Sequence, residues 1–555
     1  MRAFAYAGLI ALVAGVIFGQ SDNAPKFEIA DVHVSAKTPN AIFRAAAPRN
    51  GRYEIKNATM LDLIRTAYGF DADKILDGPN WLELDRFDVI AKIPAGAATD
   101  AQKTMLQSLL EDRFKLVVRK DTKPLTTWAL ITGKQPHLKQ ADGSGSTGCK
   151  LQSASGPPTE GAGRLFMSNP DGTTTTISLG PGAAIQYECR NMTMAAFADG
   201  LRSMLGVNNL GTNPVLDETG LKGTWNFDVK WSLQLIGPAN GGGEQISVID
   251  AIEKQLGLKL EPRQIPKPVI VVESVNRTPG ENPPGVAEAL PAIPAPTEFE
   301  VADVKLAAPM GRGMPPMIGL RMMPGGRFVS QNMPMRLLLG RAFNTNNNDQ
   351  IVGLPSWADS LRVDITAKTP EGTVTGPGVD MDALAPMLRA LLVDRFKMTY
   401  HSEERPVSAW SLVAAKPKMK KADPASRIFC RNSVGAAGSP PGSQTITCQN
   451  TTMALLAERL QNQAQGLNWP ILDATGIEGG WDFTLTYSRF PPNINGPGRG
   501  GDAGLPDAAP VASDPGGGST IFEAIEKQLG LKLESRKRPM PVIVIDHLEQ
   551  KPTDN

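Results

Sequence analysis

Apolar residues recur along the chain with spacings that predict a mixture of helices and strands. The segment Thr104–Phe114 places four apolar side chains on one helical face, and Met60 opens a similar pattern that stops at Gly69. The β-branched run Val269–Val272 is typical of a buried strand. Alternating segments at Lys115–Arg119 and Leu125–Ile131 predict two more strands.

Most of these patterns occur twice, because the chain is a tandem duplication. The segment Phe27–Ser274 recurs with drift as Phe299–Asp546. The sequence Leu-Leu-Glu-Asp-Arg-Phe-Lys that starts at Leu109 returns as Leu-Leu-Val-Asp-Arg-Phe-Lys from Leu391. A repeat of this length sets the architecture, so it constrains the fold more strongly than any local pattern.

A fainter symmetry lies inside each copy. An Asn followed three residues later by a Met occurs at Asn57, Asn191, Asn332 and Asn450. We expect each Asn to cap a helix, because its side chain accepts well from the first free N–H groups. The pattern favours two related half-units per copy, although convergence on a common cap is the alternative.

These observations predict an α+β protein with two homologous lobes, each a mixed sheet with flanking helices. The expected division is a signal peptide at 1–20, a first repeat at 21–278, a Pro-rich linker at 279–296 and a second repeat at 297–555. Since each repeat carries its own set of apolar elements, we expect each to fold independently.

The N-terminus predicts export. Arg2 precedes the nearly continuous apolar run Ala3–Gly19, and polar residues follow, which is the pattern of a signal peptide cleaved near Gly19. An uncleaved membrane anchor is the alternative. The charge balance of 57 basic and 56 acidic residues argues against nucleic acid as a partner.

The chain has four cysteines, two in each copy: Cys149, Cys189, Cys430 and Cys448. In an exported protein this predicts one disulfide per copy, Cys149–Cys189 and Cys430–Cys448. Metal binding is the alternative, but no Cys-x-x-Cys pair or neighbouring His accompanies them.

Few residues suit catalysis, and few of those recur. The chain holds four histidines, His33, His137, His401 and His547, and none matches another between the copies. The pairs Asp112-Arg113 and Asp394-Arg395 do recur. A catalytic carboxylate is one interpretation; the other is a structural role near a helix end, where Arg favours the C-terminal dipole. We assign no catalytic, cofactor-binding or metal-binding residue.

Tryptophans also recur in register, at Trp81 and Trp357, Trp128 and Trp410, and Trp225 and Trp481. Trp can stack on sugars or peptides, but in strands it more often belongs to the core.

Motifs spread over both copies resemble those of the soil-bacterial secreted family catalogued as domain of unknown function 3738. They include Phe299–Val304, Gly325–Phe328, Pro355–Ala358, Asp473–Gly476 and Gln528–Glu534. The resemblance implies no activity. It implies an extracytoplasmic sensing or partner-binding role, since some members of the family are fused to or encoded near membrane metallopeptidases of the antibiotic-sensor type. The helix–strand units also resemble, weakly, short periplasmic domains of secretins and outer-membrane receptors.

We therefore expect a periplasmic or secreted, non-catalytic binding or sensing module without a cofactor, whose partner is an envelope protein or extracellular ligand. The alternative is an extracytoplasmic hydrolase that uses Asp or Glu carboxylates. Tandem copies suit binding, because a second site raises avidity without new chemistry.

Overall fold

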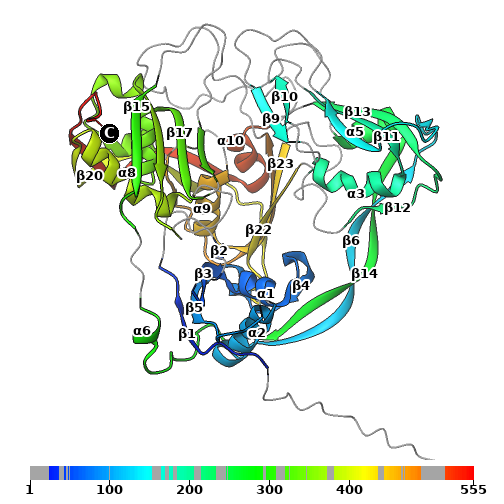
Figure 1. Cartoon of the computed structure of the whole chain (residues 1–555), viewed down its shortest axis with the longest axis horizontal. Helices are drawn as coiled ribbons and strands as arrows, with labels where there is room; N and C mark the ends of the chain where they lie inside the picture. Colours follow the sequence, from blue (N-terminus) through cyan, green and yellow to red (C-terminus); the bar gives the residue numbers. More distant parts are fainter. Residues whose placement is uncertain are drawn as a thin grey trace, which may run out of the picture.

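The computed structural model describes residues 24–36, 43–45, 48, 50–98, 100–152, 164–168, 174–178, 184–205, 214–232, 246, 248–291, 296–307, 319–323, 325–345, 347–371, 380–434, 443–463, 467, 469–488 and 519–554. It confirms an α+β fold with two homologous repeats (Figure 1). Each repeat consists of two small α+β units joined by a long two-stranded ribbon. We call the units 1a and 1b in the first repeat and 2a and 2b in the second.

Unit 1a is a four-stranded antiparallel sheet, in the order β1-β5-β3-β2, covered on one face by two helices. Its elements are β1 (Ile29–Val34), β2 (Arg44–Ala45), β3 (Arg52–Thr59), α1 (Met60–Tyr68), β4 (Ile75–Asp77), β5 (Arg86–Lys92) and α2 (Ala101–Phe114). Strand residues alternate between buried and partly exposed, so one sheet face meets the helices. Gly69 ends α1 in the left-handed conformation, as its sequence position predicts.

Units 1b, 2a and 2b have the same strand order: β7-β13-β11-β8, β15-β19-β17-β16 and β21-β25-β23-β22. Unit 1b contains β7 (Lys139–Gln140), β8 (Gly148–Gln152), β11 (Ala184–Met192), α3 (Met194–Leu205), β12 (Leu216–Asp217), β13 (Trp225–Ser232) and α5 (Val248–Leu256), and carries the separate hairpin β9 (Arg164–Ser168) and β10 (Thr174–Ser178). Unit 2a contains β15 (Val301–Leu306), β16 (Gly319–Met323), β17 (Arg327–Pro334), α7 (Met335–Ala342), β18 (Ile351–Val352), β19 (Arg362–Lys368) and α8 (Met381–Arg395). Unit 2b contains β21 (Lys420–Lys421), β22 (Phe429–Val434), β23 (Ser443–Thr451), α9 (Met453–Gln463), β24 (Ile471–Asp473), β25 (Trp481–Ser488) and α10 (Ile521–Ala524), which continues as a π-helical turn over Ile525–Leu529. The expected half-units are therefore real.

Each unit buries its own apolar core, so the described residues form four small cores. The equivalent strand residues Phe87 and Phe227 each meet a phenylalanine, which comes from the second helix in unit 1a and from the first helix in unit 1b. In unit 1a the rings of Phe87 and Phe114 meet edge-on with centroids 4.9 Å apart, and in unit 1b Phe197 and Phe227 do so at 4.8 Å. This geometry is favourable for aromatic pairs, and it ties a helix to a central strand in both units.

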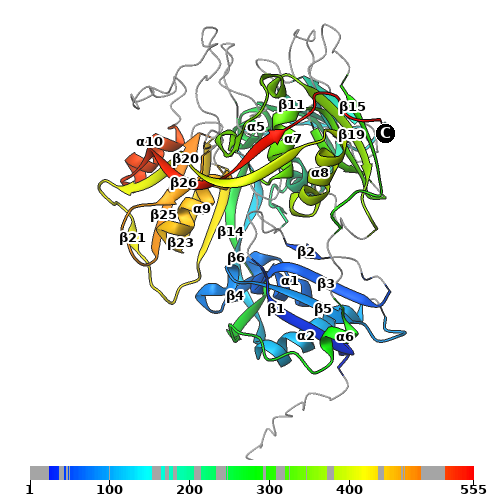
Figure 2. The same cartoon turned by 90° about the vertical axis from the view of Figure 1, so that its left-hand side faces the viewer.

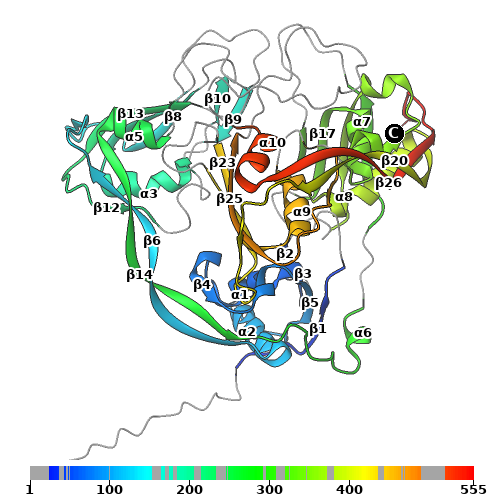
Figure 3. The same cartoon turned by 180° about the vertical axis from the view of Figure 1, so that it is seen from behind.

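The two units of each repeat share a ribbon of two long antiparallel strands (Figures 2 and 3). Strand β6 (Val117–Thr132) pairs with β14 (Leu258–Ser274), and β20 (Thr399–Ala414) pairs with β26 (Leu531–His547). The two strands expected from Lys115 to Ile131 are thus one. At either end of the first ribbon, β4 joins β14 and β12 joins β6, both in parallel.

Prolines face each other at the middle of both ribbons. Pro124 lies opposite Pro266, and Pro406 lies opposite Pro539. Proline has no N–H, so it leaves the ladder intact only where the N–H would point away from the partner strand. The prolines therefore remove donors from the outer edges of the ribbon, which hinders pairing with a further strand.

The Asn residues expected to cap helices do not cap them. In unit 1a the cap is Thr59, whose hydroxyl accepts from the N–H of Asp62. Each Asn sits instead at a β-bulge in the left-handed conformation, with φ between 47° and 55°. Its N–H donates to a side-chain oxygen on the neighbouring strand at 2.6–2.9 Å; the acceptors are Asp88, Asn226, Asp364 and Asp482. Asn tolerates this backbone better than other side-chain-bearing residues, and this explains the fourfold pattern.

Unit 1a contacts both units of the second repeat. Toward unit 2a, Arg44 binds Asp380, the N-cap of α8, and lies 3.3 Å from the Asp382 carboxylate. Toward unit 2b, the Ile428 N–H donates to the Asn80 carbonyl at 3.0 Å, and Arg427 binds Glu83. The repeats thus dock through polar and ionic contacts between separate cores.

The start of the expected linker also packs on unit 1a. The Asn276 N–H donates to the Phe114 carbonyl and the Gly280 N–H to the Arg113 carbonyl, both at 2.7 Å. Asn282 accepts from the Val32 N–H at 2.9 Å and so covers the edge strand β1. Helix α6 (Val286–Ala289) follows.

Candidate functional site

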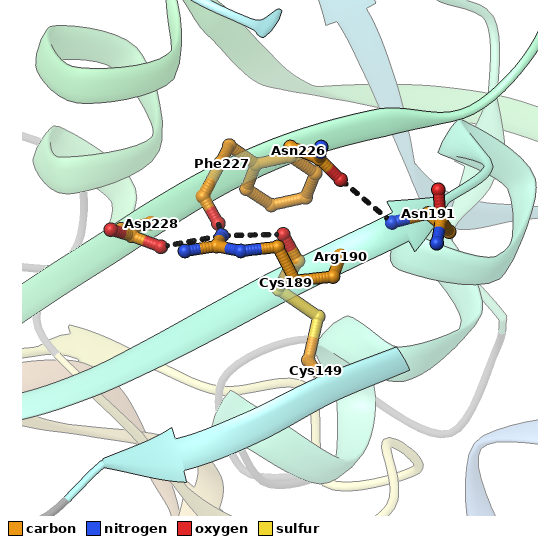
Figure 4. The surroundings of a disulfide bond; sticks show 7 residues. All are labelled: Cys149, Cys189, Arg190, Asn191, Asn226, Phe227 and Asp228. Carbon is orange, nitrogen blue, oxygen red and sulfur yellow. Dashed lines mark hydrogen bonds and ion pairs between the residues drawn. A yellow bond between two sulfur atoms is a disulfide. The ribbon is translucent and has the colours of Figure 1, made fainter. Parts of the chain in front are cut away.

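The four cysteines form two disulfides, one in each b unit. Cys149 lies directly opposite Cys189 on neighbouring strands, and Cys430 lies opposite Cys448 in the same way. The sulfur atoms of Cys189 and Cys448 face the core, since these residues are almost fully buried. Figure 4 shows the first bridge beside Arg190, whose guanidinium binds Asp228 at 2.8 Å. These disulfides hold an edge strand to the sheet, and they leave no cysteine free for chemistry.

The recurring carboxylates lie on the surface at helix ends. The side chains of Asp112 and Asp394 are 74% and 67% exposed, and each lies 3.9 Å from a lysine, Lys115 or Lys397. They belong to different units, and Asp394 also lies 3.1 Å from the guanidinium of Arg395. Among the described residues neither carboxylate has a histidine or a hydroxyl group as a partner. Acid–base catalysis needs a positioned carboxylate in a shielded setting. The geometry favours the structural interpretation of the motif.

The arginine of the motif has the more specific role. Arg113 is 6% exposed and donates to the carbonyls of Gly280 and Ala30 and to the Asn282 side-chain oxygen, at 2.5–3.3 Å. In the second repeat, Arg395 binds the Asp554 carbonyl, while the Thr553 N–H returns to the Arg395 carbonyl. Arg113 and Arg395 therefore fasten the segment that follows each ribbon. The matching Pro-x-acid-Asn sequences at 279–282 and 552–555 could have predicted this role from the sequence.

The histidines do not come together. His33 lies between Asp31 and Asp88 at 3.3 and 3.6 Å, and Lys305 lies 2.7 Å from Asp303 at the same place in unit 2a. This position thus holds a basic side chain beside a carboxylate on an edge strand. In the described part of the chain, no group of three His, Cys, Asp or Glu residues is arranged to hold a metal ion.

His401, on the second ribbon, has a carboxylate partner. Its Nδ1 lies 2.9 Å from Asp546, and this hydrogen bond raises the pKa of the imidazole above its ordinary value. His137 and His547 lie elsewhere, and His547 is 3.9 Å from Glu549. These are surface pairs, which contribute little to stability.

The recurring tryptophans mostly pack against the cores. Trp81 is 7% exposed, and the other five are partly buried beside core residues: Trp128, Trp225, Trp357, Trp410 and Trp481. They belong to the scaffold of the units rather than to a sugar-stacking surface.

One aromatic cluster is more open, and sequence comparison of the copies did not single it out. In unit 2b, Trp410 contacts Trp469 and Phe522, with ring centroids 5.1 and 5.0 Å apart. Phe522 is 38% exposed, and so is Leu472 on the edge strand β24 of the same unit. In unit 1b the position of Phe522 is taken by Ile249, so the cluster is a feature of the second repeat. It is the most aromatic partly exposed surface that we identify.

A family model described as protein of unknown function (DUF3738) matches residues 61–275 and again residues 336–548. The two matches cover the two repeats. No curated protein and no solved structure matches the chain. Among the described residues, no helix is both long and apolar enough to cross a membrane.

Proposed function

Because this chain belongs to the family described as protein of unknown function (DUF3738), here as a tandem duplication, we propose its role from its own structure: an exported, non-catalytic binding or sensing module of the bacterial envelope. The observation that carries the proposal is what the four units share. They share a strand order, a bulge held by an Asn N–H, and a core. In the part of the chain that the structure describes, they do not share a catalytic constellation.

Two disulfides in a chain with four cysteines support an extracellular or periplasmic location, since such bonds persist in oxidising compartments. Export through the apolar segment at 1–20, with cleavage near Gly19, is part of the proposal; this segment lies outside the described residues. Sequencing the N-terminus of exported protein tests it, and an intact Met1 in the membrane fraction would contradict cleavage.

We place the partner contact on the partly exposed aromatic cluster of Trp410, Trp469 and Phe522. Partly exposed aromatic side chains give large contact area at low entropic cost, which suits an envelope protein or an extracellular ligand.

The experiment compares wild type with Phe522→Ala and Trp469→Ala in quantitative cross-linking to envelope extract. We expect saturable capture of a defined partner that falls at least tenfold in the double variant. Ile249→Ala is the matched control, because it makes a comparable truncation at the equivalent place in the first repeat. Equal capture by all variants would remove this surface from the proposal.

The second candidate, a hydrolase that uses Asp112 or Asp394, is tested in parallel. Wild type and the Asp112→Asn/Asp394→Asn double variant are assayed on peptide, ester and glycan substrates. Turnover by wild type that is lost in the double variant would overturn the binding role. Capture that survives both substitutions, without turnover, supports it.

A further inference from the structure

The contact between the repeats joins unlike surfaces, and each surface has a counterpart elsewhere in the chain. Unit 1a offers the face around its short 3₁₀ helix Asn80–Glu83, which we call the a-face. Unit 2b offers residues 423–431, which we call the b-loop. Contacts between unlike surfaces do not close on themselves, so they leave one of each surface unused in a tandem chain. The unused ones are the a-face of unit 2a and the b-loop of unit 1b.

The a-face of unit 2a is open. Glu83, at the centre of the occupied face, has a side chain that is 19% exposed, whereas its counterpart Asp359 is 61% exposed. The 3₁₀ helix itself is preserved as Ser356–Asp359. The acidic residue is therefore kept at the same place, but nothing in the described chain covers it as unit 2b covers Glu83.

The b-loop of unit 1b keeps the same framework over residues 142–150. Asp142 accepts from the Ser144 N–H at 2.9 Å, as Asp423 accepts from the Ala425 N–H at 2.9 Å. The side-chain amide of Asn191 holds loop carbonyls, as that of Asn450 does in unit 2b. The two loops are thus anchored by the same two side chains, while their backbones differ: Gly143, Gly145 and Gly148 have positive φ and the corresponding Pro424, Ser426 and Phe429 do not.

The unused pair of surfaces differs from the occupied pair in charged residues on both the a-face and the b-loop. In the occupied contact, Glu83 receives Arg427 from the b-loop, and Leu61 fills the neighbouring place on the a-face. In the unused pair the b-loop has Ser146 in place of Arg427, and the a-face has Arg336 in place of Leu61.

Arg336 binds Asp359 within unit 2a. The first cation of the unused pair is therefore on the a-face, whereas in the occupied contact it is Arg427 on the b-loop. The second cation stays on the loop: Arg431, 3.6 Å from Glu83, corresponds to Lys150. Both the occupied and the unused pair of surfaces can therefore place an acidic side chain between two cations. The small side chain of Ser146 leaves room for Arg336.

A second position changes in the same paired way. Arg86 of unit 1a lies in the field of Asp62 on its own unit and of Glu458 and Arg459 on α9 of unit 2b. The unused a-face has Leu337 in place of Asp62, and α3 of unit 1b has Gly200 in place of Arg459. Both charges are lost together. Leu337 is 45% exposed, an apolar residue with no described cover.

We propose that a second copy of this chain docks its unit 1b b-loop on the a-face of unit 2a, which gives head-to-tail assembly. Units 2a and 1b lie at opposite ends of the molecule in Figures 1 and 3, so one chain cannot join them. The contact lacks the tether that raises the effective concentration of the internal one, and it is correspondingly weaker. Its affinity also depends on ionic strength, because Asp359 and Lys150 are exposed to solvent before docking.

Sedimentation velocity on the full chain, from about 1 to 500 μM at low salt, tests this proposal. We expect the weight-average mass to rise continuously with concentration and to fall back as salt is added. Asp359→Lys and Lys150→Glu should each shift the onset at least fivefold higher, and the combined variant should recover most of the wild-type association.

Asp394→Lys and Lys230→Glu are the matched controls, because they reverse exposed charges on the same two units outside the proposed contact. A chain that stays monomeric over the whole range would overturn the proposal. So would a discrete dimer that grows no further, or assembly that the controls weaken as much as Asp359→Lys and Lys150→Glu do.

Discussion

Replacing Arg113 by Met should release the segment 276–282 from unit 1a. The guanidinium is almost fully buried, and burial lowers its pKa, but its ordinary pKa is so high that it stays charged. Methionine keeps much of the side-chain volume and removes every donor. The carbonyls of Gly280 and Ala30 and the amide oxygen of Asn282 then lose their charged partner.

The magnitude follows from these contacts. A hydrogen bond to a charged group contributes about 1.5–3 kcal/mol, and part of each is recovered when water enters, so we expect a local loss of about 3 kcal/mol. That corresponds to about 150-fold faster amide exchange, at about 1.4 kcal/mol per factor of ten. The reporters are the N–H groups of Val32, Asn276 and Gly280, whose acceptors lie in this contact.

Hydrogen exchange followed by mass spectrometry on peptides that cover β1 and residues 276–282 measures this directly. Arg119→Met is the control, because Arg119 is half exposed and pairs only with Asp121 and Glu273 among the described residues; we expect less than a threefold change there. If both variants accelerate exchange equally, or neither does, Arg113 is not what fastens the segment.

Two further outcomes follow from the repeated geometry. Leu320 lies opposite Ser330 in unit 2a at the place of a disulfide in the b units, so Leu320→Cys/Ser330→Cys should oxidise spontaneously and stabilise by about 2–3 kcal/mol; free thiols under oxidising conditions, counted by mass spectrometry, would contradict the equivalence. The pKa of His401 is raised above 6.5 by Asp546, so the pair stabilises the fold at lower pH, and this contribution is lost as pH rises through the raised pKa. Asp546→Asn should return the imidazole pKa toward 6.5 in an NMR titration, and an unchanged value would show that the contact is not made in solution.

Much of the architecture could be predicted from the sequence, because duplication and hydrophobic spacing are visible in it. The mixed fold, the two repeats and the half-units were all accessible. The misassigned Asn caps show where the reasoning failed. An Asn three residues before a Met fits a cap and a left-handed bulge equally well, and the acceptor that decides between them, such as Asp88 for Asn57, lies on another strand.

The ribbons and the docking of the repeats could not be predicted from the sequence. A strand of 16 residues with a proline near its middle, such as β6, is predicted as two short strands, since proline is unfavourable in a central strand. Only the pairing of Pro124 with Pro266 shows why it is tolerated. The contacts of Glu83 with unit 2b depend on three-dimensional proximity, which no local pattern encodes.

The shared ribbons have a consequence for the order in which the protein acquires its structure. Unit 1a is not a contiguous stretch of chain: Ile75 pairs with Ile270, so its second sheet closes only with a strand that is made almost 200 residues later. During synthesis the core of unit 1a therefore stays incomplete until the entire first repeat has been made. Closing a chain loop of this length costs conformational entropy before any stabilising contact forms. We therefore expect each repeat, and no smaller part, to be the unit that can mature or be truncated without leaving an open core.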